Sequence, residues 1–293
     1  MLQAKNTATS LSEEVIIMLQ RIISNALKPH YILKKSMRKI NAIFTKHILN
    51  KRRKIKFEGK SIFTMRNFGE ITNMRIETFE TKEPETLCWI NGFKNEDTLL
   101  DIGANVGIYS LYAASRGHQI AAIEPDALNF ALLCLNIKDN NFNELIIPYP
   151  YSMHESSALS VLNVDNHNWG ATASSFHRSM DWTGKMMKPV FKQGSPGISI
   201  DDFTEASQFF PNHIKIDVDG NEFLILSGAE KTLSNPNCKS ILVELFENHP
   251  EYQRCLSLIE KNGFTLLEKS CSPMFSSDAQ HAENYIFVKK NEQ

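Results

Sequence analysis

Acidic residues stand at the ends of two apolar runs that flank a glycine-rich turn. In the stretch TLLDIGANVGIYSLYAASRGHQIAAIE, Asp101 lies near the end of the first run and Glu124 directly follows the second. Between them, Gly103, Asn105 and Gly107 occupy alternate positions, and these residue types accept the left-handed backbone of a tight turn. A carboxylate about 20 residues beyond such a turn is typical of ribose binding, since it accepts hydrogen bonds from adjacent hydroxyls.

The order of these residues favours a cationic nucleoside over a dinucleotide. The dinucleotide fingerprint is G-x-G-x-x-G, which faces a pyrophosphate, whereas here the order is Asp101-x-Gly103-x-Asn105-x-Gly107. An acid before the turn suits S-adenosylmethionine, which carries an ammonium, a sulfonium and a ribose but no phosphate. We therefore predict this cofactor. A nicotinamide-dependent oxidoreductase and a turn that binds nothing are the alternatives.

The elements that must hold these residues alternate along the chain. Around the turn we predict a strand at 98–102, a helix at 108–115 and a strand at 120–123. The further predicted strands are 145–149, 158–164, 197–200, 214–218, 241–245, 264–267 and 285–288, and the further helices are 129–140, 223–233 and 251–262. This order is typical of a doubly wound α/β sheet, mostly parallel, with a C-terminal antiparallel hairpin. Because ligands bind at the carboxyl ends of parallel strands, Asp101, Glu124 and Asp217 should converge on one crevice.

Residues 1–60 differ from the rest and are predicted to form a basic amphipathic helical extension. Residues 12–27 have helical periodicity, and residues 28–60 hold twelve Lys and Arg against one acid, Glu58. Two interpretations stay open, an arm that contacts anionic membrane or an anionic acceptor, and a solvated helical lid. Residues 61–97 are predicted to lead into the sheet and cover its edge or mouth, with a strand at 61–65 and a helix at 77–91 that is interrupted at Pro84.

Composition bounds the class of protein. The 293 residues carry a formal net charge of −1, so no overall field attracts nucleic acid. The five cysteines are scattered without a C-x-x-C pair, which favours neither zinc nor disulfides and fits a reducing compartment. We find no signal peptide and no apolar run long enough to span a bilayer. A cytoplasmic location follows, at the inner face of the membrane if the basic arm binds lipid.

A set of motifs resembles the FkbM family of S-adenosylmethionine-dependent methyltransferases. The motifs lie in order within residues 98–290 and are Asp101-Ile-Gly-Ala-Asn-Val-Gly107, Ile123-Glu-Pro125, Ile200-Asp-Asp-Phe203, Ile214-Lys-Ile-Asp-Val-Asp-Gly-Asn-Glu222, Gly228-Ala229 and Leu242-Val-Glu244. The resemblance implies a seven-stranded class I, Rossmann-like methyltransferase domain over residues 98–293. It also implies O-methylation of a hydroxyl on a sugar, glycan or natural product. The family's usual glutamate in its D-V-E-G motif is Asp219 here.

The resemblance also implies which residues bind the cofactor. Glu124 should bind the ribose, and Ser152 should lie near the adenine. The remaining expected contacts, with the first four at the methionine end, are Asp101, Gly103, Ala104, Asn105, Gly107 and Pro125.

A sugar hydroxyl is a poor nucleophile until a base takes its proton, so a positioned base is expected. Asp217, at the end of the strand beside the methyl group, is the first candidate, and Glu244 and His249 are the next. Asp217 could instead accept backbone amides in the following turn, and His249 could be an ordinary surface residue.

Two further alternatives stay open. The first is a metal-assisted O-methyltransferase that uses Mg²⁺, with oxygen ligands from Asp217, Glu247 and Asn248. The second is a non-catalytic protein that binds a membrane or polysaccharide through its basic arm.

Overall fold

The chain divides into two compact units, residues 1–51 and 52–293. The computed structural model describes Val15, Ile17, Met18, Arg21 and residues 37–42, 51–181, 183–271 and 282–290. The described residues of the first unit before residue 51 are helical, and the rest of the predicted arm up to residue 50 lies outside the described residues. The predicted helical extension to residue 60 is wrong in its last part, because residues 52–57 form a strand.

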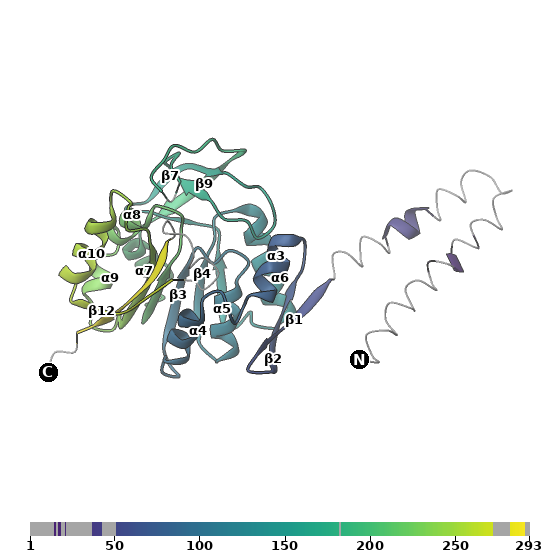
Figure 1. The fold of residues 1–293 in the computed structure, drawn as a ribbon, viewed down its shortest axis with the longest axis horizontal. Coiled ribbons are helices and arrows are strands. Elements are labelled where there is room, and N and C mark those ends of the chain that lie inside the picture. Colours follow the sequence, from purple (N-terminus) through teal and green to yellow (C-terminus); the bar gives the residue numbers. More distant parts are fainter. Residues whose placement is uncertain are drawn as a thin grey trace. The chain divides into compact units, whose positions relative to one another are not determined.

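A seven-stranded sheet forms the centre of the second unit, in the order β12-β13-β11-β10-β3-β4-β5 (Figure 1). Its strands are β3 (Thr98–Ile102), β4 (Gln119–Ile123), β5 (Ile146–Tyr149), β10 (His213–Ile216), β11 (Ser240–Leu245), β12 (Phe264–Ser270) and β13 (Glu283–Lys289). Every pair from β5 to β11 is parallel, and β13 is antiparallel to both of its neighbours. The predicted α/β sheet with a C-terminal antiparallel hairpin is therefore confirmed. The last strand lies inside the sheet, with β12 at its edge.

Helices cover both faces of this sheet because successive strand residues point to opposite sides. Leu99 packs in one core cluster and its neighbour Leu100 in the other. The first cluster lies under α3 (Glu70–Glu77), α4 (Pro84–Asn91), α5 (Ile108–Ser115), α6 (Ala127–Asp139) and the hairpin of β1 (Arg52–Phe57) and β2 (Lys60–Arg66). The second lies under α7 (Ile200–Ser207), α8 (Glu222–Ser227), α9 (Glu230–Ser234) and α10 (Tyr252–Lys261). Figure 1 shows α3 and α6 on one side of the sheet and α9 and α10 on the other.

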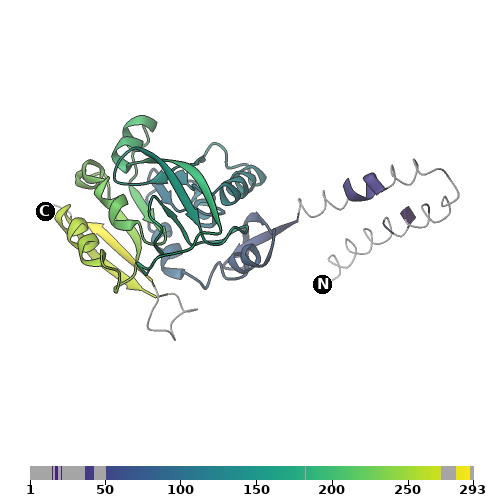
Figure 2. The ribbon, with the colours of Figure 1, turned by 90° about the horizontal axis from the view of Figure 1, so that it is seen from above.

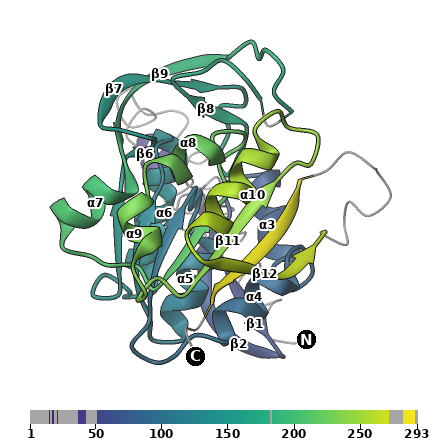
Figure 3. The ribbon, with the colours of Figure 1, turned by 90° about the vertical axis from the view of Figure 1, so that its left-hand side faces the viewer.

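A second sheet is inserted between β5 and β10, in the order β6-β9-β7-β8. Its strands are β6 (Ser152–Met153), β7 (Ala158–Val164), β8 (Ser174–Phe176) and β9 (Phe191–Ile198). Figure 3 shows this sheet beyond one end of the central sheet, and Figure 2 shows its teal strands crossing over the unit. The sequence predicts β7 but treats most of the segment as a loop, because β8 is short and β9 contains Gly and Pro.

Two predicted helices are corrected by the structure. Of the helix predicted at 77–91, only the part from the predicted interruption at Pro84 is helical, as α4, because α3 ends at Glu77. The helix predicted at 223–233 is broken into α8 and α9. At that break a Cβ on Gly228 would lie 2.6 Å from the carbonyl oxygen of His154, so the close packing needs glycine. The helix predicted at 129–140 begins at Ala127, because Asp126 is the N-cap of α6 and accepts hydrogen bonds from two amides of the first turn. Within the described residues, no helix is long and apolar enough to cross a membrane.

Candidate active site

A cavity of about 270 Å³ opens at the carboxyl ends of β3, β4, β10 and β11. It brings together seven of the residues predicted to form the site: Gly103, Ala104, Asn105, Glu124, Pro125, Asp217 and Glu244. The cavity lies at the switch point of the doubly wound sheet, where the strand order reverses between β3 and β10, and the role of its residues in cofactor binding stays a prediction.

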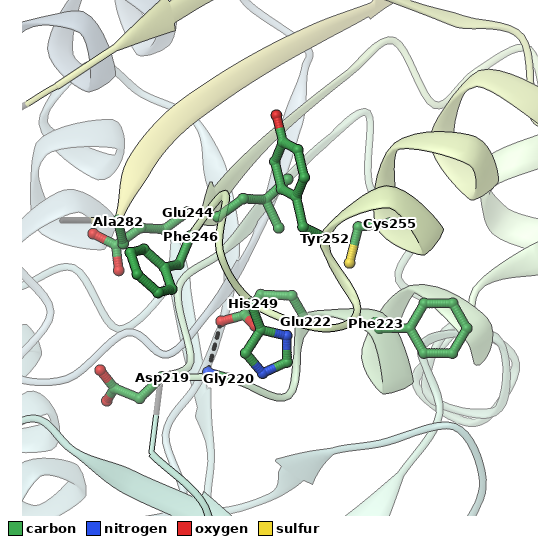
Figure 4. A pocket seen from close by; sticks show the side chains of 11 residues that line it. Asp219, Gly220, Glu222, Phe223, Glu244, Phe246, His249, Tyr252, Cys255 and Ala282 are labelled. Atoms are coloured by element: carbon green, nitrogen blue, oxygen red, sulfur yellow. Dashed lines mark hydrogen bonds between the residues drawn. The ribbon is translucent and has the colours of Figure 1, made fainter. Parts of the chain in front are cut away.

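Two smaller cavities share walls with this one and account for two more predicted residues. Ser152 lines a mostly apolar cavity of about 30 Å³ that also touches Gly103 and Pro125. His249 lines a cavity of about 20 Å³ that shares Asp219 and Glu244 with the large one. We call this last space the His249 cavity; Figure 4 shows the carboxyl groups and aromatic rings around it.

The glycine-rich turn has the predicted left-handed backbone, with φ of 79° at Gly103, 53° at Asn105 and 89° at Gly107. A Cβ on Gly103 would lie 1.9 Å from the carbonyl oxygen of Asp217. Glycine is required there because the turn passes against the end of β10. Gly107 packs against Leu133 and does not line the cavity.

Glu124 is held in place by the backbone of its surroundings. Its two carboxylate oxygens accept hydrogen bonds from the amides of Asn105 and Asp126, each at 2.8 Å. Burial raises the pKa of Glu124 to about 8. Each oxygen keeps a second lone pair, so the carboxyl can still accept a hydroxyl, and the ribose role stays a prediction.

Asp101 lies behind the cavity wall. It is 1% exposed, and Ser110 Oγ donates to its Oδ2 at 2.5 Å. Its Oδ1 is buried without a hydrogen-bond partner among the described residues, and burial raises its pKa. Asp101 is not among the residues that line the cavity, so its contact with the methionine end of the cofactor stays a prediction.

Lys215 is a residue of the site that the sequence reasoning missed. It is fully buried, and its Nζ donates to Asp217 Oδ2 at 2.7 Å and lies 5.0 Å from the centre of the Tyr109 ring. Burial opposes ionisation of Asp217, but the charge of Lys215 outweighs it and lowers the pKa of Asp217 to about 2. A lysine inside the apolar run Ile214–Ile216 was the signal available in the sequence.

The other two predicted bases are poorly suited to accept a proton. Burial, then the charges of Asp217 and Glu83, raise the pKa of Glu244 well above its usual value, which favours the neutral carboxyl. Burial lowers the pKa of His249, and its Nδ1 accepts the amide of Glu251 at 3.2 Å. The neutral ring then carries its proton on Nε2, so it is placed to donate.

Asp219 lines both the large cavity and the His249 cavity. It has a left-handed backbone with φ of 52°, and its Oδ2 accepts the amide of Ala173 at 2.7 Å. Burial, with repulsion from Asp217, raises the pKa of Asp219 to about 6. Asp219 is therefore an acid placed between the two spaces, with a pKa near neutrality.

Residues ahead of β3 complete the large cavity with positive charge. Arg75 and Lys82 both line it. Arg75 Nε donates to the carbonyl oxygen of Gly170 at 2.9 Å, and Lys82 forms an ion pair with Glu83 at 2.5 Å. The segment predicted only as a cover thus contributes side chains to the site.

The predicted magnesium ligands are not assembled. Glu247 is bonded to Lys269 at 2.6 Å and to the hydroxyl of Tyr285, whereas Asp217 is bonded to Lys215. Within the described part of the chain, no three His, Cys, Asp or Glu side chains are placed to hold one metal ion. Asp217 and Glu247 are thus each paired with a lysine in this structure, and the metal-assisted alternative stays a prediction.

Comparison with known families decides the identity of this domain. A model of the methyltransferase FkbM domain matches residues 101–266, which is more than half of the chain. The chain belongs to the FkbM methyltransferase family. FkbM enzymes depend on S-adenosylmethionine, so the predicted cofactor is the cofactor of the family. The matched range of this FkbM protein holds every predicted site residue but not Arg75 or Lys82.

Solved structures similar to this FkbM protein include two methyltransferase-type proteins. An FkbM methyltransferase from Methylobacillus flagellatus is 17% identical with a TM-score of 0.46, over 74% of this chain and 52% of that one. Fibrillarin from Aeropyrum pernix, solved with natively bound S-adenosyl-L-methionine, is 11% identical with a TM-score of 0.44, over 82% of this chain and 84% of that one. The chain thus spans about half the length of the Methylobacillus protein. No curated protein matches it.

Proposed function

We propose that this FkbM protein transfers the methyl group of S-adenosylmethionine to a hydroxyl oxygen of a sugar, glycan or natural product. The observation that carries the proposal is the pair of adjoining cavities within the family domain, which share Asp219 and Glu244. One space suits the donor and the other suits the acceptor, and a carboxyl group stands between them.

The residues of the large cavity fit the donor. Glu124 accepts the ribose hydroxyls, and the turn from Gly103 to Asn105 lines the methionine end. The small apolar cavity beside Pro125 and Ser152 takes the adenine. When bound, the cofactor supplies an electrophilic methyl group. The mixed charges of the cavity suit its zwitterionic tail, because the lining includes acids together with Arg75 and Lys82.

The His249 cavity holds the acceptor hydroxyl in this proposal. In-line methyl transfer requires the oxygen at about 3–3.5 Å from the methyl carbon. Asp217 was the first candidate for the base, but a carboxylate with a pKa of about 2 is a weak proton acceptor. Asp219, with a pKa of about 6, is closer to the optimum for a general base. We therefore assign the proton to Asp219 and the orientation of the acceptor to Glu244 and His249.

Methyl transfer from tritiated S-adenosylmethionine tests this function. The full chain is incubated with the donor and with lipid and saccharide fractions of a cell envelope. We expect label in one fraction with the native chain, and strongly reduced label with Asp219→Asn. Glu205→Gln, an exposed acid on α7, is the matched control and should transfer normally. Absence of label in every fraction, from a protein that binds S-adenosylhomocysteine, would contradict the proposed acceptor class.

Residues 28–60 are proposed to contact anionic membrane from the cytoplasmic side. Their charge supports this, with twelve basic residues and one acid. Deletion of residues 1–51, the first compact unit, should reduce sedimentation with anionic vesicles at low salt. Unchanged sedimentation would contradict a role for the arm.

A further inference from the structure

Exposed apolar side chains gather on the inserted sheet and its loop. Of the nine large apolar residues that are exposed among the described residues of the second unit, five belong to it: Leu159 (85% exposed), Val161 (40%), Met186 (79%), Val190 (68%) and Phe191 (41%). Scattered single exposed residues are ordinary, but a concentration in one insertion marks an interaction surface.

Lysines are interleaved with these apolar residues. In the sequence Lys185-Met-Met-Lys-Pro-Val-Phe-Lys192 the three lysines are exposed, and no acid occurs between residues 182 and 200. Among the described residues, none of the three ammonium groups forms an ion pair. The segment is therefore both apolar and positively charged.

The segment is fixed to the inserted sheet rather than loosely attached. The amide of Met187 donates to Ser179 O at 3.0 Å, and the amide of Val190 donates to Val164 O at 2.9 Å. A Cβ on Gly184 would lie 3.2 Å from Pro250 and 3.6 Å from His249. Gly184, directly before the segment, therefore lies against His249, which lines the His249 cavity.

We propose that residues 185–192 form a docking surface for an anionic lipid bilayer. Met186, Val190 and Phe191 enter the boundary between headgroups and acyl chains, and the lysines bind lipid phosphates. Nucleic acid would bind the lysines but leave the apolar side chains in water. An uncharged apolar partner would cover the apolar side chains but leave the lysines without counter-charges. A bilayer with anionic headgroups satisfies both.

The position of this surface bears on the acceptor. Because Gly184 packs against His249 and Pro250, docking would bring the His249 cavity next to the lipid headgroups. The acceptor would then be a hydroxyl carried on a membrane lipid or a lipid-linked glycan, a consequence that rests on the proposed function.

Vesicle binding tests the surface without any methyl transfer. The full chain is mixed with vesicles of phosphatidylcholine containing about 30% phosphatidylglycerol, and the partition coefficient is measured by sedimentation. Lys185→Gln, Lys188→Gln and Lys192→Gln together should lower it about 100-fold at low salt. Lys94→Gln, Lys138→Gln and Lys231→Gln remove the same charge from other exposed positions and should change it about twofold at most.

A second variant, Met186→Ser with Val190→Ser, removes the apolar contribution. It should lower binding about tenfold or more even at high salt, where charge is screened. Both variants should bind S-adenosylhomocysteine like the native chain, which shows that they fold and separates this test from failure of the proposed function.

Three outcomes would overturn the docking surface. One is equal partitioning of the native chain and the Lys185, Lys188 and Lys192 variant, which would assign vesicle binding to residues 28–60. Another is binding to pure phosphatidylcholine at the same strength. The third is a lipid-independent dimer in sedimentation velocity that only Met186→Ser with Val190→Ser dissociates, since this would identify the surface as an interface between two copies.

Discussion

Lys215 and Asp217 form an ion pair of 2.7 Å that runs from the core into the large cavity. The lysine side chain is 1% exposed and the aspartate side chain 27%. Burial opposes the charge of Lys215, but the nearby carboxylates of Asp217, Glu83 and Asp101 raise its pKa above its usual value. The positive charge of this buried lysine is therefore attracted to three carboxyl groups, Asp101 on β3, Asp217 after β10 and Glu83 before α4.

Asp217→Asn should destabilise the protein by about 3–5 kcal/mol, because it removes the nearest counter-charge of a buried lysine. Chemical denaturation measures this loss. The double change with Lys215→Met should recover part of it, since no unpaired charge then remains. A double variant no more stable than the single one would show that the pair is not the cause.

Stability without ligand should fall as the pH rises from 7 to 9. Burial raises the pKa of Glu222 to about 7 and that of Glu124 to about 8, both above their unfolded values. The native state therefore binds more protons than the unfolded state in this window, and each proton lost on raising the pH costs stability. For Glu124 the fall is about 1–2 kcal/mol.

Denaturant unfolding at pH 7 and pH 9 measures this effect. Glu124→Gln should flatten the pH dependence, whereas the exposed control Glu205→Gln should leave it unchanged. Equal slopes in the native chain and in Glu124→Gln would show that Glu124 does not retain its proton on folding.

Arg75 should bind the carboxylate of the cofactor's methionine tail. Among the described residues it forms no ion pair, whereas Lys82 and Lys215, the other cations of the cavity, are paired. Arg75→Met should weaken S-adenosylhomocysteine binding about tenfold or more. It should leave 5′-methylthioadenosine, which lacks the tail, unaffected.

Calorimetry with both ligands checks the role of Arg75. Arg116→Met, at an exposed position at the end of α5, is the matched control. Equal losses for the two ligands would show that Arg75 supports the cavity as a whole rather than the carboxylate.

The sequence predicted the central sheet well because its strands are nearly continuous apolar runs followed by acids at their carboxyl ends. Glu124 and Asp217 were placed correctly for that reason. The inserted sheet was mostly missed, because its strands carry few apolar residues and their pairing is non-local. The contacts of Arg75 could not be predicted either, because α3 reaches the cavity only through tertiary packing.

The protonation states of the acids in the site could not be predicted from the sequence either. Whether Asp217, Asp219 or Glu244 is charged depends on the burial of each carboxyl and on the charges around it, which no spacing in the sequence reveals. Asp217 was therefore chosen as the base, although the structure pairs it with the lysine.

Titration calorimetry of the full chain with S-adenosylhomocysteine tests the central claim most directly, because that claim is a cofactor site built around Glu124. We predict one molecule bound per chain, an affinity lowered by about 1.5–3 kcal/mol in Glu124→Ala, and no binding of NAD under the same conditions. Unchanged affinity in Glu124→Ala, or binding of NAD in place of S-adenosylhomocysteine, would contradict it.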